Sequence, residues 1–341
     1  MIKWYQSEGP DNGIVLSSRI RLARNLVDFP FHSKISFEQR EQLNEKVASA
    51  LKNINLGENK LRFLKLNELS QLKRYSLVEQ HEISREFAAE PEHRMLVLSE
   101  DHAISIMVNE EDHLRIQVMT NGLDLRKAYR LCDQIDDVLD ETLTYAFDEK
   151  LGYLTSCPTN LGTGLRASVM MHLPALEQTG LISKLTSTIN KLGLTIRGTY
   201  GEGSSVIGSI YQISNQITLG ITEQDAIQNL ESVARQIIES EEKARESLKN
   251  QDSRRLEDVV FRSLGTLKYA RLLSGNDFFK AVSNVRLGVS MGIIPGLSYT
   301  KLNELMNLTG TATICEVAGK QLPPEERDYT RGAVVRQKLE E

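Results

Sequence analysis

The sequence predicts an α+β fold in which an antiparallel sheet is flanked by helices and followed by a smaller all-helical domain. Within residues 95–119 the apolar pattern shifts towards a period of two, which is typical of consecutive antiparallel strands. Other long segments repeat apolar residues every three or four positions, as amphipathic helices do. Beyond residue 255 only the helical period continues, so we expect no strand there. A chain of 341 residues is long enough for one large and one small domain.

The expected elements follow from local patterns taken in chain order. Residues 14–26 alternate apolar side chains with small, polar or basic ones, which predicts a strand with Arg19 and Arg21 on one face. Ser36 is a suitable N-cap for the helix after it, and Thr222 with Asp225 resembles a capping box. We expect further strands at 95–98, 104–108, 114–118, 152–155, 194–199, 207–213 and 216–219, and helices at 37–51, 66–83, 124–147, 222–238, 259–273, 277–291, 299–308 and 311–318.

Residues 156–176 form the most distinctive stretch of the chain. Cys157 precedes a proline, Gly162-Thr163-Gly164 predicts a tight turn, and Arg166 follows it. The apolar spacing beyond Arg166 indicates a helix that continues to about residue 192. Glycine amides and an arginine fork suit a phosphate. Taken alone, this stretch favours an ordinary turn before a helix.

A highly charged segment, 239–255, has almost no apolar residue to bury, and we place the domain boundary there. The expected domains are residues 1–250 and residues 251–341. The second domain ends with Arg327 and Arg331, which share one face of a predicted helix. They could bind a phosphate together or pair with nearby carboxylates such as Asp328, and the motif alone favours the ion pair.

Composition restricts the class of protein. Hydrophobic residues make up 40% and charged residues 26% of the chain, and its net charge of -5 argues against a broadly basic nucleic-acid surface. There is no apolar run long enough to span a membrane and no signal-peptide layout at the start, so we expect a cytoplasmic protein. The cysteines Cys132, Cys157 and Cys315 are far apart, and the histidines form no H-x-x-x-H pair, so we expect no disulfide framework and no metal site held by the protein.

Several charged side chains are candidates for chemistry. Glu111 belongs to a run of three carboxylates in a predicted turn, and Arg115 follows on the next strand. Arg197 ends a strand, and Glu202 lies between glycines in the loop after it, where a carboxylate can close over a ligand. Each feature also has a structural explanation, since acidic turns and charged strand edges are common on protein surfaces.

Four segments together resemble a known family. SSRIR (17–21), VNEEDHLRI (108–116), TSCPTNLGTGLRAS (155–168) and RGTYGE (197–202) resemble, in the same order, the catalytic core of the phosphagen kinases, which are ATP:guanido phosphotransferases. The resemblance covers roughly residues 14–245. It implies a phosphagen-kinase-like catalytic domain that uses ATP, with Mg²⁺ carried by the nucleotide.

The resemblance also implies roles for particular residues. It implies that arginines bind the nucleotide phosphates and that His81 lies near the adenosine. It implies that Glu111 and Glu202 hold the guanidinium, with Cys157 beside it; we expect Glu111 to be the general base. The residues expected at the nucleotide are Ser17, Ser18, Arg19, Ile20, Arg21, His81, Arg115, Arg166, Ala167, Ser168, Val169, Met170, Arg197, Gly198, Thr199, Tyr200, Gly201 and Glu202.

Within the family the chain is most similar to the bacterial protein-arginine kinases. Only 16 residues precede SSRIR, where small-molecule phosphagen kinases have a helical domain that helps to enclose the substrate. We therefore expect an open cleft that admits an arginine of a protein. In these kinases an RDxxRA motif binds phosphoarginine as an allosteric ligand. It corresponds here to Arg327, Asp328 and Arg331, with Gly332 in place of alanine.

The same resemblance implies a place in the stress response. Expected partners are substrate proteins with exposed arginines, including a heat-shock repressor, together with a Clp ATPase and protease and a zinc-binding activator protein. The extra apolar surface of the helical C-terminal domain also predicts a second copy of the chain as a partner. We expect no membrane partner and no direct nucleic-acid partner. Two other hypotheses stay open: a kinase for arginine or another small guanidino compound, and a non-catalytic adaptor that reads phosphoarginine.

Overall fold

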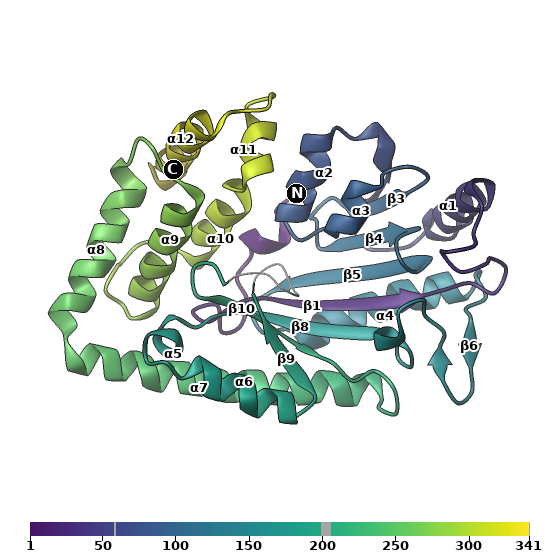
Figure 1. Ribbon diagram of the computed structural model, residues 1–341, viewed down its shortest axis with the longest axis horizontal. Coiled ribbons are helices and arrows are strands. Elements are labelled where there is room, and N and C mark those ends of the chain that lie inside the picture. The colour runs from purple at the N-terminus through teal and green to yellow at the C-terminus, as the bar shows by residue number, and fades with distance from the viewer. Residues whose placement is uncertain (58, 199–205, 341) are drawn as a thin grey trace.

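The computed structural model describes residues 1–57, 59–198 and 206–340. Its centre is an antiparallel sheet with the strand order β2-β3-β4-β5-β1-β8-β10-β9 (Figure 1). The short strands β6 and β7 form a separate hairpin. The strand bounds are β1 Val15–Arg24, β2 Leu61–Lys65, β3 Met95–Ser99, β4 Ile104–Val108, β5 Leu114–Asn121, β6 Phe147–Asp148, β7 Gly152–Tyr153, β8 Leu165–His172, β9 Leu194–Arg197 and β10 Ile210–Asn215.

Helices lie before, between and after these strands in the sequence. The α-helices are α1 Phe37–Leu51, α2 Gln71–Glu79, α3 Arg85–Ala89, α4 Leu125–Asp140, α5 Pro174–Gln178, α6 Ile182–Lys191, α7 Glu223–Gln251, α8 Ser253–Tyr269, α9 Gly275–Ser290, α10 Tyr299–Leu308, α11 Thr311–Val317 and α12 Pro324–Glu340. Three short 3₁₀ helices are η1 Trp4–Gln6, η2 Leu66–Glu68 and η3 Pro158–Asn160. In the described ranges no helix is both long and apolar enough to cross a membrane.

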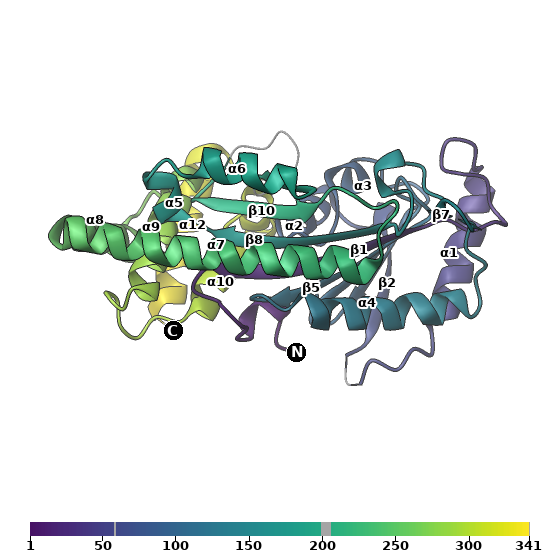
Figure 2. The same ribbon diagram turned by 90° about the horizontal axis from the view of Figure 1, so that it is seen from below.

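Helices cover one face of the sheet along its central strands, and we call it the covered face. The opposite face carries the polar residues of interest, beside a part of β3 and β4 on which α2 and α3 pack. Helices α4 and α7 pack against the covered face, and both run along the length of the sheet in Figure 2. Ile20, Leu22 and Val169 point into this layer and are almost completely buried. Burial of such side chains contributes about 1.5–3 kcal/mol each to stability. Because strand side chains alternate, the residues between them point to the opposite face.

Capping residues fix where several helices begin, as the sequence predicts. Ser36 accepts a hydrogen bond from the Gln39 amide, and Gln39 returns one to Ser36, which completes a capping box at α1. Thr222 and Asp225 form the equivalent box at α7. The three consecutive strands expected within 95–119 are also present, as β3, β4 and β5.

The prediction of a helix directly after Arg166 is wrong, because residues 165–172 form strand β8. Leu165, Ala167, Val169 and Met171 alternate into the core and are fully buried. The apolar Met170 between them obscured the period of two. Residues 216–219 do not form the expected strand, and the helix expected over 124–147 ends at Asp140.

The charged segment 239–255 is not an exposed linker. Helix α7 continues through it to Gln251 without a break, and Asp252 then caps α8. Glu241 and Arg245 are buried there as an ion pair with an N–O distance of 2.8 Å. Two charges that neutralise each other can therefore pack where no apolar residue is available. The predicted division between residues 250 and 251 falls at the last turn of this helix.

The C-terminal helices α8 to α12 form a compact unit with its own apolar core around Val260, Phe278 and Leu302. This unit lies beside the sheet and approaches α2 through α11 and η1 through α10 (Figure 1). None of the residues described beyond residue 255 lies in a strand, as the sequence predicts.

Candidate functional site

Strand register places the candidate arginines on the face of the sheet opposite α4 and α7. Arg21 on β1 lies opposite Arg166 on β8, and opposite Gln117 on β5. Arg19, two residues earlier, lies opposite Ser168. Side chains of paired residues in an antiparallel sheet point to the same face. Arginines from distant parts of the sequence therefore gather at one place.

These side chains line a cavity of about 330 Å³, which we call the arginine pocket. Among the described residues its wall contains six arginines and one carboxylate, that of Glu86. The five arginines predicted from the sequence all contribute, together with His81. The arginines are Arg19, Arg21, Arg85, Arg115, Arg166 and Arg197.

The positive charges in the arginine pocket repel one another. Burial, followed by repulsion from Arg115 and Arg166, lowers the pKa of Arg19 to about 9, which still leaves it charged at neutral pH. Its hydrogen bonds go to uncharged side chains: Nε donates to Ser168 Oγ at 3.2 Å and Nη2 to Gln212 Oε1 at 3.1 Å. The buried Nε of Arg21 has no hydrogen-bond partner among the described residues. An anion with several oxygens would satisfy both the charge and this donor.

Arg115 is held differently, by a carboxylate. Its Nη1 lies 2.6 and 2.8 Å from the two carboxylate oxygens of Glu110, and Ser84 donates a hydrogen bond to the same carboxylate. Burial alone would lower the pKa of Arg115, but Glu110 more than offsets that effect and the pKa is raised. Glu110 therefore fixes the direction of Arg115 and offsets part of the charge on this side of the pocket.

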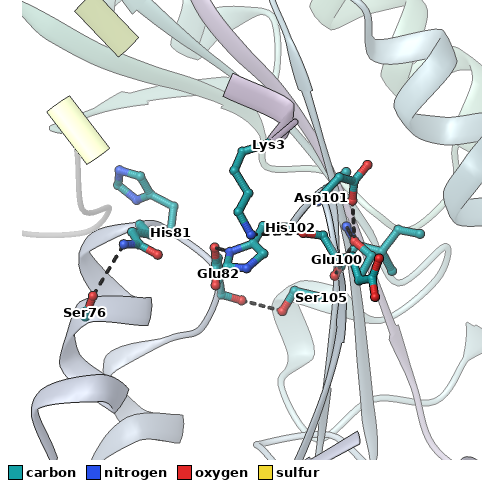
Figure 3. Close-up of polar contacts among 12 residues, drawn as sticks. Lys3, Ser76, His81, Glu82, Glu100, Asp101, His102 and Ser105 are labelled. Atoms are coloured by element: carbon teal, nitrogen blue, oxygen red, sulfur yellow. Dashed lines mark hydrogen bonds and ion pairs between the residues drawn. The ribbon is translucent and has the colours of Figure 1, made fainter. Parts of the chain in front are cut away.

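His81 lies at the edge of the arginine pocket in an unusual backbone conformation. Its φ is 61°, and its carbonyl accepts a hydrogen bond from Gln117 Nε2 at 2.8 Å. Figure 3 shows that His81 and Glu82 diverge after α2, with Glu82 turned towards His102. Burial, and to a smaller extent Arg19, lowers the pKa of His81 to about 3, so its imidazole is neutral. A neutral ring suits contact with an uncharged base of a nucleotide.

The side chains of Glu111 and Cys157 lie close together beside the arginine pocket, where the thiol acts to lower the pKa of the carboxyl. The pKa of Glu111 is raised, chiefly by burial and then by repulsion from Asp112 and Glu110. A carboxylate with a raised pKa is a stronger proton acceptor than an ordinary one. Glu111 nevertheless keeps an exposed side chain, so a substrate can approach it from solvent.

Asp112 and Asn25 hold this pair of residues in place, and sequence reasoning missed both. Asp112 Oδ1 accepts hydrogen bonds from the Ser156 amide at 2.6 Å and from Asn25 Nδ2 at 2.7 Å. Asn25 also donates to the Leu154 carbonyl at 3.0 Å and accepts from the His113 amide at 2.9 Å. Asn25 is 2% exposed. It thus connects the turn that holds Glu111 to the loop that holds Cys157.

Some of the residues expected at the nucleotide have side chains elsewhere. Ile20, Ala167 and Val169 point to the covered face of the sheet, because they alternate with the arginines along their strands. Ser18 donates to the Gly122 carbonyl at 2.8 Å and is completely buried. These four residues therefore support the strands and do not line the arginine pocket.

The other expected residues lie at the boundary of the pocket or outside the described ranges. Ser17 and Met170 line a smaller neighbouring cavity that shares His81 with the arginine pocket. Ser168 contacts Arg19. Gly198 follows β9 and is the last residue before a gap in the described ranges. Thr199, Tyr200, Gly201 and Glu202 lie in that gap, so Glu202, the second carboxylate expected at the guanidinium, lies outside the described residues.

The Gly162-Thr163-Gly164 turn does not line the arginine pocket, so its interpretation as a phosphate cradle is wrong. The Thr163 carbonyl accepts a hydrogen bond from the buried Arg24 Nη1 at 2.9 Å. A Cβ on Gly162 would overlap the Thr218 carbonyl, and its φ of 112° also favours glycine. The glycines allow the backbone to pack closely, and the alternative of an ordinary turn is the correct one.

Arg331 is occupied by contacts within the C-terminal unit. Its guanidinium donates to Asp328 at 2.7 Å and to the carbonyls of Leu273 and Thr309 at 2.7 and 2.9 Å. The ion pair that the motif alone favours is therefore present. The structure explains why glycine and not alanine occupies position 332, since a Cβ there would lie 2.9 Å from the carbonyl oxygen of Arg271. Arg327 is partly exposed one turn before Arg331 on α12.

Arg85 and Gln212 are further pocket residues that sequence reasoning missed. Arg85 begins α3, in a segment without a recognisable motif. Gln212 lies opposite Arg197 in the ladder between β10 and β9, and it binds Arg19. For Gln117 a signal was available, because it lies two residues after Arg115 on the same strand. For Arg85 and Gln212 the sequence has no such signal, and only the tertiary structure places them at the pocket.

The chain is similar to known proteins along nearly its whole length. Residues 42–244 match the family described as ATP:guanido phosphotransferase, C-terminal catalytic domain, and residues 253–341 match the Protein-arginine kinase McsB C-terminal domain. A protein-arginine kinase of Geobacillus sp. (strain WCH70) is 49% identical over 339 residues, which are 98% of this chain and 93% of that protein. One from Symbiobacterium thermophilum is 47% identical over 339 residues, 99% of this chain and 96% of that protein.

Two kinds of solved structure are also similar. The duplicated taurocyamine kinase from Schistosoma mansoni, with bound transition state analog components, has a TM-score of 0.60 and 32% identity over 69% of this chain and 34% of that chain. A lombricine kinase has a TM-score of 0.60 and 26% identity over 68% of this chain and 67% of its own. This chain thus spans about a third of the length of the duplicated taurocyamine kinase.

Proposed function

The chain belongs to the ATP:guanido phosphotransferase family, and we propose that it acts as a protein-arginine kinase. It is an ATP-dependent enzyme that phosphorylates guanidino groups, and the acceptor we propose is the side chain of arginine in a protein. One observation carries the assignment of its site: a pocket with six arginines lies beside a carboxylate of raised pKa. The two regions have opposite charges, as a polyphosphate and a guanidinium require.

The arginine pocket is suited to the polyphosphate of ATP. Arg19, Arg21 and Arg166 come from neighbouring positions on two paired strands, so their spacing is set by the ladder of the sheet. Fixed donors of this kind neutralise phosphate oxygens and hold the reacting phosphorus in place. The buried and unpartnered Nε of Arg21 is the donor that most directly calls for such a ligand.

Glu111 is suited to the guanidinium. We propose that its carboxylate accepts a hydrogen bond from the substrate, orients one guanidinium nitrogen and takes up the proton of that nitrogen. The nitrogen then forms a bond to the γ-phosphorus while the bond between that phosphorus and the bridging oxygen breaks, and ADP leaves with the electron pair. Cys157 touches Glu111 and assists in positioning it, and no covalent enzyme intermediate is needed.

We propose that Mg²⁺ enters with the nucleotide. Among the described residues no group of three or more histidine, cysteine, aspartate or glutamate side chains is arranged to hold a metal ion. Mg²⁺ commonly keeps several water ligands and is bound mainly by substrate phosphates, so the pocket residues fit this arrangement. When bound, the ion would reduce the negative charge of the phosphates and orient them.

A kinase for small guanidino compounds is the second candidate. It is favoured by the similarity to taurocyamine kinase and lombricine kinase, whose names specify small guanidino substrates. That similarity has 26–32% identity over about two thirds of the chain, whereas the protein-arginine kinases are 47–49% identical over nearly all of it. The stronger likeness supports a protein acceptor.

The assignment can be tested by comparing acceptors. The purified full chain, with ATP and Mg²⁺, is given either an arginine-rich protein such as casein or free L-arginine, and products are identified by mass spectrometry without acidic handling. We expect phosphoarginine on the protein and little product from the free amino acid. Equal or faster phosphorylation of L-arginine would favour the second candidate, and undiminished product from Glu111→Gln would contradict the proposed site.

The cellular role we propose extends this activity. By the same family resemblance, phosphoarginine would mark proteins, including a heat-shock repressor, for a Clp ATPase and protease in the cytoplasm. A zinc-binding protein would act as activator, the C-terminal helical unit would form a homodimer contact, and Arg327 with Arg331 would bind phosphoarginine. Pull-down with a phosphoarginine peptide, compared between wild type and Arg327→Ala, tests the last of these proposals.

A further inference from the structure

Helix α2 connects the C-terminal helical unit to the arginine pocket. Its last residue is Glu79, and the residues directly after it contribute His81 and Arg85 to the wall of the pocket. On its other side, α2 packs against α11, and the two helices lie side by side in Figure 1. One short helix is therefore shared by the site of chemistry and by a separate unit of the protein.

The contact between α2 and α11 is centred on the carboxylate of Glu79. Its Oε1 accepts a hydrogen bond from the Ala312 amide at 2.8 Å, and Oε2 accepts from the Thr313 amide and hydroxyl at 2.9 and 2.8 Å. Glu79 thus accepts hydrogen bonds from amides in the first turn of α11, and such amides have no acceptor within their own helix. Gly310 allows this approach, because a Cβ there would overlap the Glu79 carboxylate.

Other contacts across the same interface differ in burial. Ser76 Oγ and Thr313 Oγ1 share a buried hydrogen bond of 3.1 Å next to Glu79. Lys73 and Glu316 form an ion pair of 2.9 Å at the edge of the interface, where both side chains are about one third exposed. Exposed pairs of this kind contribute little to stability, so Lys73 is a suitable control position.

The residues after α2 are anchored to the sheet as well. Ser105 Oγ donates to the Glu82 carbonyl at 2.5 Å, and the Glu82 side chain contacts His102 (Figure 3). His81 lies between this anchor and Glu79. Its φ of 61° departs from the helix, and a non-glycine residue adopts such a conformation only where surrounding contacts impose it.

We propose that Glu79 is a positioning residue for the nucleotide, through which the C-terminal helical unit holds His81 and Arg85 against the arginine pocket. The proposal rests on the proposed function, in that the pocket receives ATP. Glu79 does not touch the reacting atoms. It fixes one end of the segment that forms a wall of the pocket, so loss of its hydrogen bonds lets this segment move and lowers the fraction of molecules ready to bind ATP.

The test is Glu79→Gln in the full chain, with Lys73→Ala as the matched control on the same helix. Glutamine has nearly the same shape, but it removes the charge and replaces one acceptor oxygen with a donor group that faces amide donors. We expect the Kd for MgATP, measured by calorimetry, to rise about tenfold, since charge-assisted hydrogen bonds are among the stronger contacts. Turnover at saturating ATP should change less than the Kd does, and Lys73→Ala should match wild type in both.

Hydrogen exchange gives a readout that does not depend on ATP. Amides of residues 78–86 should take up deuterium faster in Glu79→Gln than in wild type or Lys73→Ala. Thr313→Val removes one of the three hydrogen bonds to Glu79 together with the bond shared with Ser76, keeps the two amide bonds to the carboxylate, and should raise exchange in the same direction. It serves as the test if Glu79→Gln does not fold. Unchanged exchange and unchanged Kd in a folded variant would overturn the proposal. Absence of ATP binding in wild type would instead contradict the proposed function.

Discussion

The side chains of Glu111 and Cys157 lie close together across two loops that are distant in the sequence. Glu111 lies in the turn between β4 and β5, whereas Cys157 directly precedes η3. A second contact runs parallel to the first, from the Ser156 amide to Asp112 at 2.6 Å. Two consecutive residues of one loop are thus joined to two consecutive residues of the other, which limits the movement of the carboxylate that faces the substrate.

Substitution of Glu111 should remove the general base and leave the arginine pocket intact. Glu111→Gln is expected to lower kcat by about 10²–10⁴-fold, the usual contribution of a positioned base. The Kd for MgATP should stay near that of wild type, because Glu111 does not line the pocket. Single-turnover kinetics and calorimetry measure the two quantities. A large loss of ATP affinity with an unchanged rate of phosphoryl transfer would contradict the assigned role.

The rate should depend on pH through Glu111. Its pKa is raised by burial and by repulsion from Asp112 and Glu110. When the pH is lowered, activity should therefore begin to fall at a higher pH than it would if the base were a glutamate with an ordinary pKa. The nearby thiol of Cys157 opposes this rise. Cys157→Ala should therefore move the acid limb of kcat/KM to still higher pH. A profile whose acid limb is unchanged, or moves to lower pH, would show that the two side chains are not coupled.

Replacing Arg21 should affect the nucleotide more than the acceptor. Lysine keeps the charge but loses the planar fork and the buried Nε donor, so Arg21→Lys is expected to raise the KM for ATP about tenfold. Arg130→Lys, on an exposed part of α4, is the matched control and should leave the KM unchanged. If both variants have the KM of wild type, the arginine pocket does not bind the nucleotide.

Asn25 should be needed to place Glu111, although it contacts no substrate. Asn25→Ala removes a buried side chain that makes hydrogen bonds to Asp112, His113 and Leu154. We expect kcat to fall about 10-fold or more, because small displacements of a catalytic group are costly. The KM for ATP should hardly change. Asn53→Ala, at an exposed asparagine, controls for the substitution itself, and a selective rise in the KM for ATP would refute the positioning role.

His81 should make stability depend on pH. Its pKa is about 3 in the folded chain, so between the ordinary histidine pKa and pH 3 the unfolded state binds a proton that the folded state does not. Stability contributed by neutral His81 is therefore present above the ordinary pKa and is lost as the pH falls, by at most about 1.4 kcal/mol per pH unit. His81→Asn, which tolerates the positive φ, should reduce this slope in urea denaturation between pH 6 and 5. An equal slope in both proteins would contradict the prediction.

The sequence alone determined the family, the antiparallel character of the first strands and most of the charged residues at the site. It could do so because these properties depend on local order. Alternation on β1 places Arg19 and Arg21 on one face, and the acidic turn before Arg115 is contiguous. It misjudged residues 165–172, where Met170 on the polar face hides the alternation of a strand.

Only the tertiary structure decided which of these residues work together. Arg21 meets Arg166 through a strand ladder, Asn25 reaches Asp112 across two loops, and Glu79 reaches α11 across two units of the protein. Asparagine and glutamate at such positions look like any surface residue in a sequence, because their importance comes from the partner and not from their neighbours. Long-range pairing, burial and the resulting pKa values are properties of the folded chain, and local patterns do not contain them.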